Sequence, residues 1–600
     1  MAHLVDRRHL DFVLDEVLGL GDVLALPRFN AHYRAGAAQI IDTAEQLAED
    51  QFRPSLRHVD DNEPRLENGR VVLPTAIETA LTAFSAQGFF GMTATAELGG
   101  LGLPRLVANA AFLQFQAANV SIANYALLSM SAAELLAVHA TVAQQARYLA
   151  PMLEGRFFGT MALSEPGAGS SLGDITTSAK PLADGRYALR GTKMWISGGE
   201  HDMGENIVHL MLARIEGAAK GVKGLSLFIV PRKRLDEAGH PAVWNNIALA
   251  GLNHKMGQRG TVNTVLNIGE GGDCIGEIVG RPGDGLACMF TMMNEARIGV
   301  SMGSVAHASA AFQHALAYAR ERRQGRLPDQ KDPASPQVPL VQHADVRRML
   351  LQQKAAAEGG IAFGLLLAKF ADLKAAASTP DACAEAGLLL DLLTPVFKAW
   401  ISEECLTANW NAMQVLGGAG YTRDHPVELH YRDNRLNPIH EGTNGIQAID
   451  LLGRKLVMAE GRAIRLLLDE MRGTLSSARV ANLPAQLAQQ MRRAIQWIDE
   501  ALRHLSVIKS EGGQTRQLAF AHDVMELVGA TTFAWVWFLQ AQAATRALER
   551  LLPIESEFHQ GLIRTCEFVF ATVLPRAKAA LDRIESRTSV VADITEAGLG

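Results

Sequence analysis

The chain has 600 residues, of which 48% are hydrophobic and 20% are charged, and its formal net charge is −6. These fractions are typical of a soluble globular protein with several domains, and they exclude disordered, collagen-like and coiled-coil chains. The mild negative charge predicts no basic surface for nucleic acid or for an anionic membrane.

In chain order, an N-terminal extension (1–38) precedes a region (39–155) that is predicted to be helical. Apolar residues recur in this region at helical spacing. The pattern changes between 156 and 282, where glycines are dense and polar turns separate short β-prone runs. It predicts an all-β domain whose strands include residues 187–189, 207–213, 225–230 and 264–268.

Helical periodicity returns over 283–460 and predicts a second helical domain. A loop divides it, because four prolines stand between two long helical segments: Pro328, Pro333, Pro336 and Pro339. Residues 461–600 predict a further helical domain, with breaks at Pro484, Pro553 and Pro575. The whole pattern predicts an α+β multidomain protein.

The cysteines and the N-terminus indicate the compartment. The first ten residues carry charge and no apolar stretch, so no signal peptide is predicted, and no run of about 18 apolar residues predicts a membrane span. We therefore expect a cytoplasmic protein. The absence of any C-x-x-C pair argues against a disulfide framework and against a structural zinc site. The five cysteines lie far apart, at Cys274, Cys288, Cys383, Cys405 and Cys566.

Two local patterns invite other interpretations. The glycine-rich stretch 167–173 has the spacing G-x-G-x-x-x-G, and a strand–turn–strand pattern follows it where a dinucleotide-binding fingerprint needs a helix, so we reject a Rossmann site. His201, Asp202 and Glu205 lie in a glycine-containing turn without two histidines at helical spacing. No metal site is therefore predicted.

Six segments occur in a fixed order along residues 40–455. They are MALSEPGAGS (161–170), GTKMWIS (191–197), KMGQRGT (255–261), MNEAR (293–297), QVLGGAGY (414–421) and IHEGTNGIQ (439–447). Together, in this order and at these spacings, they resemble the acyl-CoA dehydrogenase family. The extra helical region 461–600 resembles the subgroup of that family with longer polypeptides.

The resemblance implies a fold and an activity. The fold comprises an N-terminal helical domain, a middle β-barrel-like domain and a C-terminal helical bundle, here with an additional C-terminal helical domain. The activity is FAD-dependent α,β-dehydrogenation of an acyl-CoA to the trans-2-enoyl-CoA, with electrons passed to an electron-transfer flavoprotein. The implied substrate is a short- to medium-chain acyl-CoA or 3-methylmercaptopropionyl-CoA, and the implied assembly is a homodimer or homotetramer.

The same resemblance assigns site residues. Glu441 matches the catalytic base that takes the α-proton, and its backbone N–H is implied to hold the thioester carbonyl. His440 stands where relatives often have tyrosine and is interpreted as a wall residue. FAD contacts are implied for Met161, Leu163, Ser164, Ser170, Trp195, Ser197, Arg322, Gln414, Val415, Leu416, Gly417, Gly418, Thr443 and Asn444. Substrate contacts are implied for Ser170, Asn294, Arg297 and Gly442.

Two differences from the family pattern and two alternatives accompany this interpretation. Arg322, implied to reach the flavin of a neighbouring subunit together with 414–418, lacks the usual phenylalanine after it, and Gly445 replaces a common Glu or Gln. One alternative is an oxidase on the same fold. The other is a nucleic-acid-associated relative whose extra C-terminal domain binds DNA. Residues 461–600 carry 16 Lys and Arg and 15 Asp and Glu, a net charge of +1, which argues against it because a DNA-binding domain usually has a concentrated basic surface.

Overall fold

The computed structural model describes residues 3–329, 332–477, 483, 485–549 and 556–600, so the predicted breaks at Pro484 and Pro553 lie outside the described part. The chain divides into two compact units. One is Ala38–Gly299, and the other combines Met1–Ala37 with Val300–Gly600. Each unit has buried hydrophobic clusters of its own.

The unit Ala38–Gly299 begins with helices and one short hairpin. The hairpin pairs β1 (Arg65–Glu67) with β2 (Arg70–Val72), in a region that the sequence pattern predicted to be mainly helical. Its turn is Asn68–Gly69, and both residues have positive φ, 51° and 77°, which is the conformation that two-residue hairpin turns need. The main helices are α3 (Arg34–Leu47), α4 (Leu56–Asp61), α5 (Thr75–Ala86), α6 (Arg105–His139), α7 (Val142–Gln144) and α8 (Ala150–Leu153).

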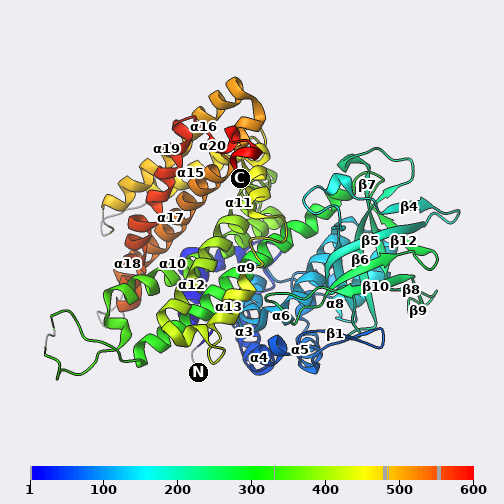
Figure 1. The fold of residues 1–600 in the computed structure, drawn as a ribbon, viewed down its shortest axis with the longest axis horizontal. Coiled ribbons are helices and arrows are strands. Elements are labelled where there is room, and N and C mark those ends of the chain that lie inside the picture. The colour runs from blue at the N-terminus through cyan, green and yellow to red at the C-terminus, as the bar shows by residue number, and fades with distance from the viewer. Residues whose placement is uncertain (1–2, 330–331, 478–482, 484, 550–555) are drawn as a thin grey trace. The chain divides into compact units, whose positions relative to one another are not determined.

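The β domain that follows is a closed sheet. Pairings run from β5 through β12, β7, β6 and β4 back to β5, while β3 extends the sheet at β6 and β11 and β10 extend it at β5 (Figure 1). This closure confirms the barrel-like middle domain, and every predicted strand lies within an observed one. The strands are β3 (Phe157–Ala162), β4 (Ser178–Pro181), β5 (Tyr187–Ser197), β6 (Asn206–Ile215), β7 (Leu225–Pro231), β8 (Lys233–Leu235), β9 (Pro241–Trp244), β10 (Ile247–Leu252), β11 (Asn263–Ile268) and β12 (Cys274–Val279).

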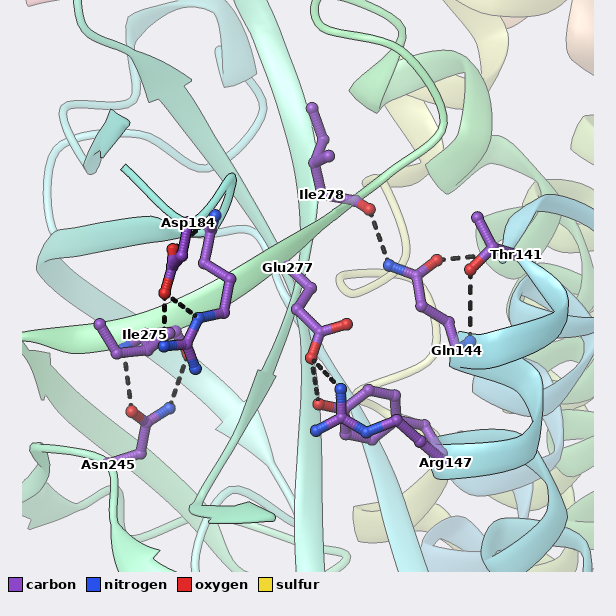
Figure 2. A network of polar contacts seen from close by, with 10 residues as sticks. Thr141, Gln144, Arg147, Asp184, Asn245, Ile275, Glu277 and Ile278 are labelled. Carbon is purple, nitrogen blue, oxygen red and sulfur yellow. Dashed lines mark hydrogen bonds and ion pairs between the residues drawn. The ribbon is translucent and has the colours of Figure 1, made fainter. Parts of the chain in front are cut away.

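The helices of this unit pack on the sheet through close contacts and polar bridges. Gly159 of β3 has no room for a side chain, because a Cβ would lie 2.4 Å from the Cβ of Ala132 on α6. Figure 2 shows β12 joined to the segment after α6: Glu277 accepts from Arg147 at 3.0 Å and from Tyr148 at 2.7 Å. In the same view Gln144 donates to the carbonyl of Ile278 at 2.9 Å, and the Gln144 side chain also closes a capping box with Thr141.

The second unit is helical and includes the N-terminal extension. His9 Nε2 lies 2.8 Å from Gln540 Oε1, so the first helix packs beside the C-terminal helices. The predicted proline loop separates α9 from α10. The helices are α1 (Arg7–Phe12), α2 (Leu20–Leu24), α9 (Gly285–Glu321, which begins in the other unit), α10 (Ala344–Ala376), α11 (Pro380–Val396), α12 (Ser402–Leu416), α13 (Val427–Asn434), α14 (Asn444–Asp450), α15 (Arg462–Ser477), α16 (Ala485–Leu518), α17 (Ala521–Leu548), α18 (Ser556–Thr572), α19 (Leu574–Glu585) and α20 (Val590–Asp593).

Helix α17 is the central helix of the additional C-terminal domain. It packs against α10, where Gly359 leaves room for Trp537 and the Trp537 indole donates to the carbonyl of Ala355 at 3.2 Å. Among the described residues, two helices, α6 and α17, are long and apolar enough to cross a membrane by length and composition. The buried share of their apolar windows is 67% for α6 and 89% for α17, and core helices of globular proteins pass the same test.

Candidate active site

The turn that carries Glu441 has a strained backbone. Glu441 and Gly442 adopt positive φ values of 56° and 85°, and for a non-glycine residue this conformation costs about 1–3 kcal/mol. Such strain persists only where neighbours hold it, and two side chains do so here. Gln447 Nε2 donates to the carbonyl oxygen of Glu441 at 2.9 Å, and Lys398 Nζ donates to that of Gly442 at 2.6 Å. Both Gln447 and Lys398 are fully buried.

Helix α14 begins directly after this turn. The side chain of Thr443 accepts from the backbone N–H of Ile446 and so caps the helix. Asn444 accepts from Lys398 Nζ at 3.1 Å and donates to Ala399 O, Ser402 Oγ and Glu403 Oε1. The structure therefore shows both side chains holding the turn, and their expected contacts with the cofactor stay predictions.

His440, the residue before Glu441, is neutral at physiological pH. Burial first, and the positive charge of Lys398 second, lower the pKa of His440 from 6.5 to about 3. Its Nε2 lies 3.0 Å from Asn437 Oδ1. The ring is therefore an uncharged, anchored group beside Glu441 in the chain.

The segment 414–418 leaves α12 through an open glycine turn. Val415 and Leu416 are buried in the helical core, so only their backbone can reach a ligand, whereas Gln414, Gly417 and Gly418 are exposed. A Cβ on either glycine would meet no atom within 4 Å. Arg322 lies just past the end of α9 and is exposed, and its guanidinium makes no hydrogen bond or ion pair with any described residue.

In the β domain, the loop after β3, with Leu163 and Ser164, lies beside the part of β5 that carries Trp195. Met194 N–H donates to the carbonyl of Ser164 at 3.0 Å, which fixes the loop after β3 to the residue preceding Trp195. Trp195 is 57% exposed and has a φ of 64°, so a large aromatic face is held outside the core by a strained backbone. Met161 is half-buried, and Ser170 is exposed on the same loop region.

A buried ion pair holds this loop on β5. Lys193 Nζ lies 3.0 Å from both Glu165 Oε1 and the carbonyl oxygen of Leu163. Glu165 also accepts hydrogen bonds from the backbone and hydroxyl groups of Thr176 and Thr177. Burial alone would raise the pKa of Glu165, but the Lys193 charge and these hydrogen bonds outweigh it and lower the pKa to about 2.

The remaining predicted residues lie on β5 and α9. Ser197 Oγ accepts from Asn263 Nδ2 at 3.0 Å. Arg297 is buried, with Nη1 at 3.4 Å from Asn294 Oδ1, so these two expected substrate residues are neighbours.

Within the described ranges, no group of three or more His, Cys, Asp or Glu could hold a metal ion.

Sequence reasoning gave no role to Lys398, Gln447 or the Glu165–Lys193 pair. Glu165, Lys193 and Gln447 lie inside the family segments named above. Their polar side chains within these motifs are the signal that could have indicated a role in holding the motif backbone. Lys398 lies outside every segment, 44 residues from Gly442, and carries no local signal.

Four family models match the chain in succession. They are described as the acyl-CoA dehydrogenase N-terminal domain (36–156), middle domain (160–267) and C-terminal domain (283–457), and as acetyl-CoA dehydrogenase C-terminal like (467–595). Among curated proteins, 3-methylmercaptopropionyl-CoA dehydrogenase from Ruegeria pomeroyi is 36% identical over 97% of this chain and 98% of its own length. A broad-specificity linear acyl-CoA dehydrogenase from Mycobacterium tuberculosis is 31% identical over 98% of each chain.

Solved structures have the same fold. An acyl-CoA dehydrogenase from Bacillus anthracis, solved with FAD, superposes with a TM-score of 0.73 at 19% identity, covering 96% of this chain and 91% of its own. ACDH-11 from Caenorhabditis elegans, solved with C11-CoA, gives a TM-score of 0.74 at 18% identity, covering 98% and 94%. The order of the six segments, the closed barrel between helical regions and these full-length similarities agree: the chain belongs to the acyl-CoA dehydrogenase family.

Proposed function

We propose that the protein is an FAD-dependent dehydrogenase of short- to medium-chain acyl-CoA, with Glu441 as the base. The observation that carries the proposal is the turn around Glu441, where a strained carboxylate-bearing residue is held by two buried donors, Lys398 and Gln447. Such strain is typical of functional sites. A side chain needed only for solubility has no reason to be fixed in this way.

The described residues fit a flavin dinucleotide. Trp195 presents an exposed apolar face suited to stacking, and the exposed Arg322 guanidinium has no partner in the described chain and suits a pyrophosphate. Gly417 and Gly418 leave their backbone open to close approach by a ligand. Arg322 and these glycines are exposed in the protomer, which supports a role toward the flavin of a second subunit in a homodimer or homotetramer.

The chemistry follows from these roles. The Glu441 carboxylate takes the α-proton, and the electron pair of that C–H bond forms the α,β double bond. FAD, when bound, accepts the β-hydrogen as a hydride. The strained peptide at Glu441 presents its N–H for the thioester oxygen, where negative charge develops. Gln447 and Lys398 hold the two carbonyls of the turn and so keep this geometry during proton transfer.

We propose an electron-transfer flavoprotein as the acceptor and the cytoplasm as the compartment. The five cysteines are all free, which supports a reducing compartment. The test is an anaerobic titration of the purified yellow protein with acyl-CoAs of four to sixteen carbons, followed by admission of oxygen. Bleaching that persists in oxygen supports a dehydrogenase, and rapid reoxidation with peroxide supports the oxidase alternative. A protein that binds no FAD, or whose flavin no acyl-CoA bleaches, would contradict the proposal.

A further inference from the structure

A chain of hydrogen bonds leads from helix α9 to the residue before the base. Asn409 Nδ2 donates to the carbonyl oxygen of His307 at 2.9 Å, and Asn434 Nδ2 donates to Asn409 Oδ1 at 2.6 Å. Asn437 Nδ2 donates to Asn434 Oδ1 at 3.0 Å, and His440 Nε2 lies 3.0 Å from Asn437 Oδ1. The three asparagines are buried, and they come from α12, the end of α13 and the loop after it.

The direction of this chain is determined by its first member, the backbone carbonyl of His307. A backbone carbonyl only accepts, so Asn409 must present its NH₂ group to His307 and its oxygen to Asn434. The same reasoning passes along Asn434 and Asn437 in turn, since each amide has one oxygen and one NH₂ group. Asn437 therefore presents an oxygen to His440, and His440 Nε2 must carry the proton.

Packing alone does not explain the three buried asparagines. Burying three amides is unfavourable unless each is hydrogen-bonded, and an apolar side chain at position 437 would serve packing alone at lower cost. The chain of amides ends on the ring that directly precedes Glu441, whose backbone has the strained φ of 56°. The charged group that acts on the ring is the Lys398 ammonium from η10 (Phe397–Ile401), and Glu441 is the next residue in the chain.

We propose that the Asn409–Asn434–Asn437 chain makes His440 a positioning residue for the catalytic Glu441 by holding its imidazole as an uncharged Nε2–H donor. The inference rests on the proposed function of Glu441 as base. An uncharged ring fixes the turn without placing a second cation beside Lys398. A protonated ring would stabilise the Glu441 carboxylate and so weaken it as a base.

Two substitutions of nearly equal size separate this role from simple packing. His440→Gln places an amide N–H near the position of Nε2 and stays neutral, whereas His440→Asn places its nitrogen near the position of Nδ1 and cannot reach Asn437. We expect the rate of flavin reduction by butyryl-CoA or octanoyl-CoA to stay within about 3-fold for the Gln variant and to fall about 10- to 100-fold for the Asn variant. FAD content and KM should remain close to those of the unaltered protein in both.

A pH profile adds a readout that packing alone would not change. Asn437→Asp replaces the neutral acceptor by a carboxylate, which stabilises the imidazolium of His440. We expect a new step in the rate between about pH 6 and 8 in this variant, because the ring then titrates in that interval. The unaltered protein and His440→Gln should lack this step.

The tautomer is also observable without activity. In protein labelled with 15N-histidine, the His440 signals, assigned by their loss in His440→Gln, should show a protonated Nε2 and an unprotonated Nδ1 from pH 5 to 8. A protonated Nδ1, equal rates for the Gln and Asn variants, or an unchanged profile for Asn437→Asp would each overturn the inference while flavin reduction by the unaltered protein still supported the function. Failure of the unaltered protein to be reduced by any acyl-CoA would overturn both.

Discussion

Lys398 Nζ lies 2.6 Å from the carbonyl oxygen of Gly442, and the same ammonium is 3.1 Å from Asn444 Oδ1. One buried cation thus holds both the turn of the base and the start of α14. Lys398 is fully buried and donates to both of these acceptors. We therefore expect Lys398 to affect the reaction through the backbone geometry of Glu441.

We expect Lys398→Met to lower the rate of flavin reduction by about 10- to 100-fold while FAD content is kept, because small displacements of a base have effects of this size. The lost donor should also cost about 1–3 kcal/mol of stability, since the acceptors stay buried. Lys369→Met is the control. Lys369 Nζ donates to the carbonyl of Leu18 at 2.7 Å, away from the turn, so this variant should lose stability without losing rate. Equal rate loss in both variants would contradict the assignment.

Glu441→Gln should keep FAD and bind acyl-CoA, but its flavin reduction should be about 10²–10⁴-fold slower, because the amide cannot accept the α-proton. Stopped-flow bleaching under anaerobic conditions measures this. Glu460→Gln is a close control, because Glu460 has the same φ of 56° but is exposed and lies outside the turn. Bleaching at the normal rate in the Glu441 variant would remove the base from the proposal.

Arg322→Ala should weaken FAD binding by about 10- to 100-fold, as expected for the loss of about 1.5–3 kcal/mol in hydrogen bonds from a charged group. Fluorescence titration of the apoprotein with FAD measures the dissociation constant. Arg323→Ala is the neighbouring control, since that guanidinium already donates to the carbonyl of Gln337 at 3.1 Å. Unchanged affinity in the Arg322 variant, with the protein still oligomeric, would show that this arginine does not serve the cofactor.

Glu165→Gln should destabilise the protein by about 3–5 kcal/mol, because it leaves the buried Lys193 charge without its partner. The pKa of Glu165 is lowered to about 2, so its contribution is fully present above the ordinary value of 4.5 and is lost as pH falls toward 2. The difference between the urea midpoints of the two proteins should therefore shrink below pH 4.5. Asp184→Asn, which removes an exposed partner of Arg186, should leave the midpoint unchanged at every pH.

The sequence predicted what local patterns encode. Alternation and turn residues identified strands such as β5, β6, β7 and β11, and the ordered motifs identified the family. The contacts that hold the site were not predictable, because they join positions that are distant in the chain and differ in type: Lys398 with Gly442, and Asn409 with His307, 102 residues apart. The N-terminal extension shows the same limit, since nothing near His9 indicates that it meets Gln540, 531 residues away.

The last prediction concerns the acyl chain. The curated relatives that match nearly the whole chain include a 3-methylmercaptopropionyl-CoA dehydrogenase, a broad-specificity linear acyl-CoA dehydrogenase and a butyryl-CoA dehydrogenase. A thioether packs much like a methylene, so we expect turnover of short to medium acyl-CoAs and of 3-methylmercaptopropionyl-CoA. Each buried methylene contributes only about 0.8 kcal/mol, so the preference should be graded. The measurement is kcat/KM from four to sixteen carbons and for the sulfur-containing thioester. A maximum at sixteen carbons with no turnover at four to eight would show that chain-length preference does not follow these relatives.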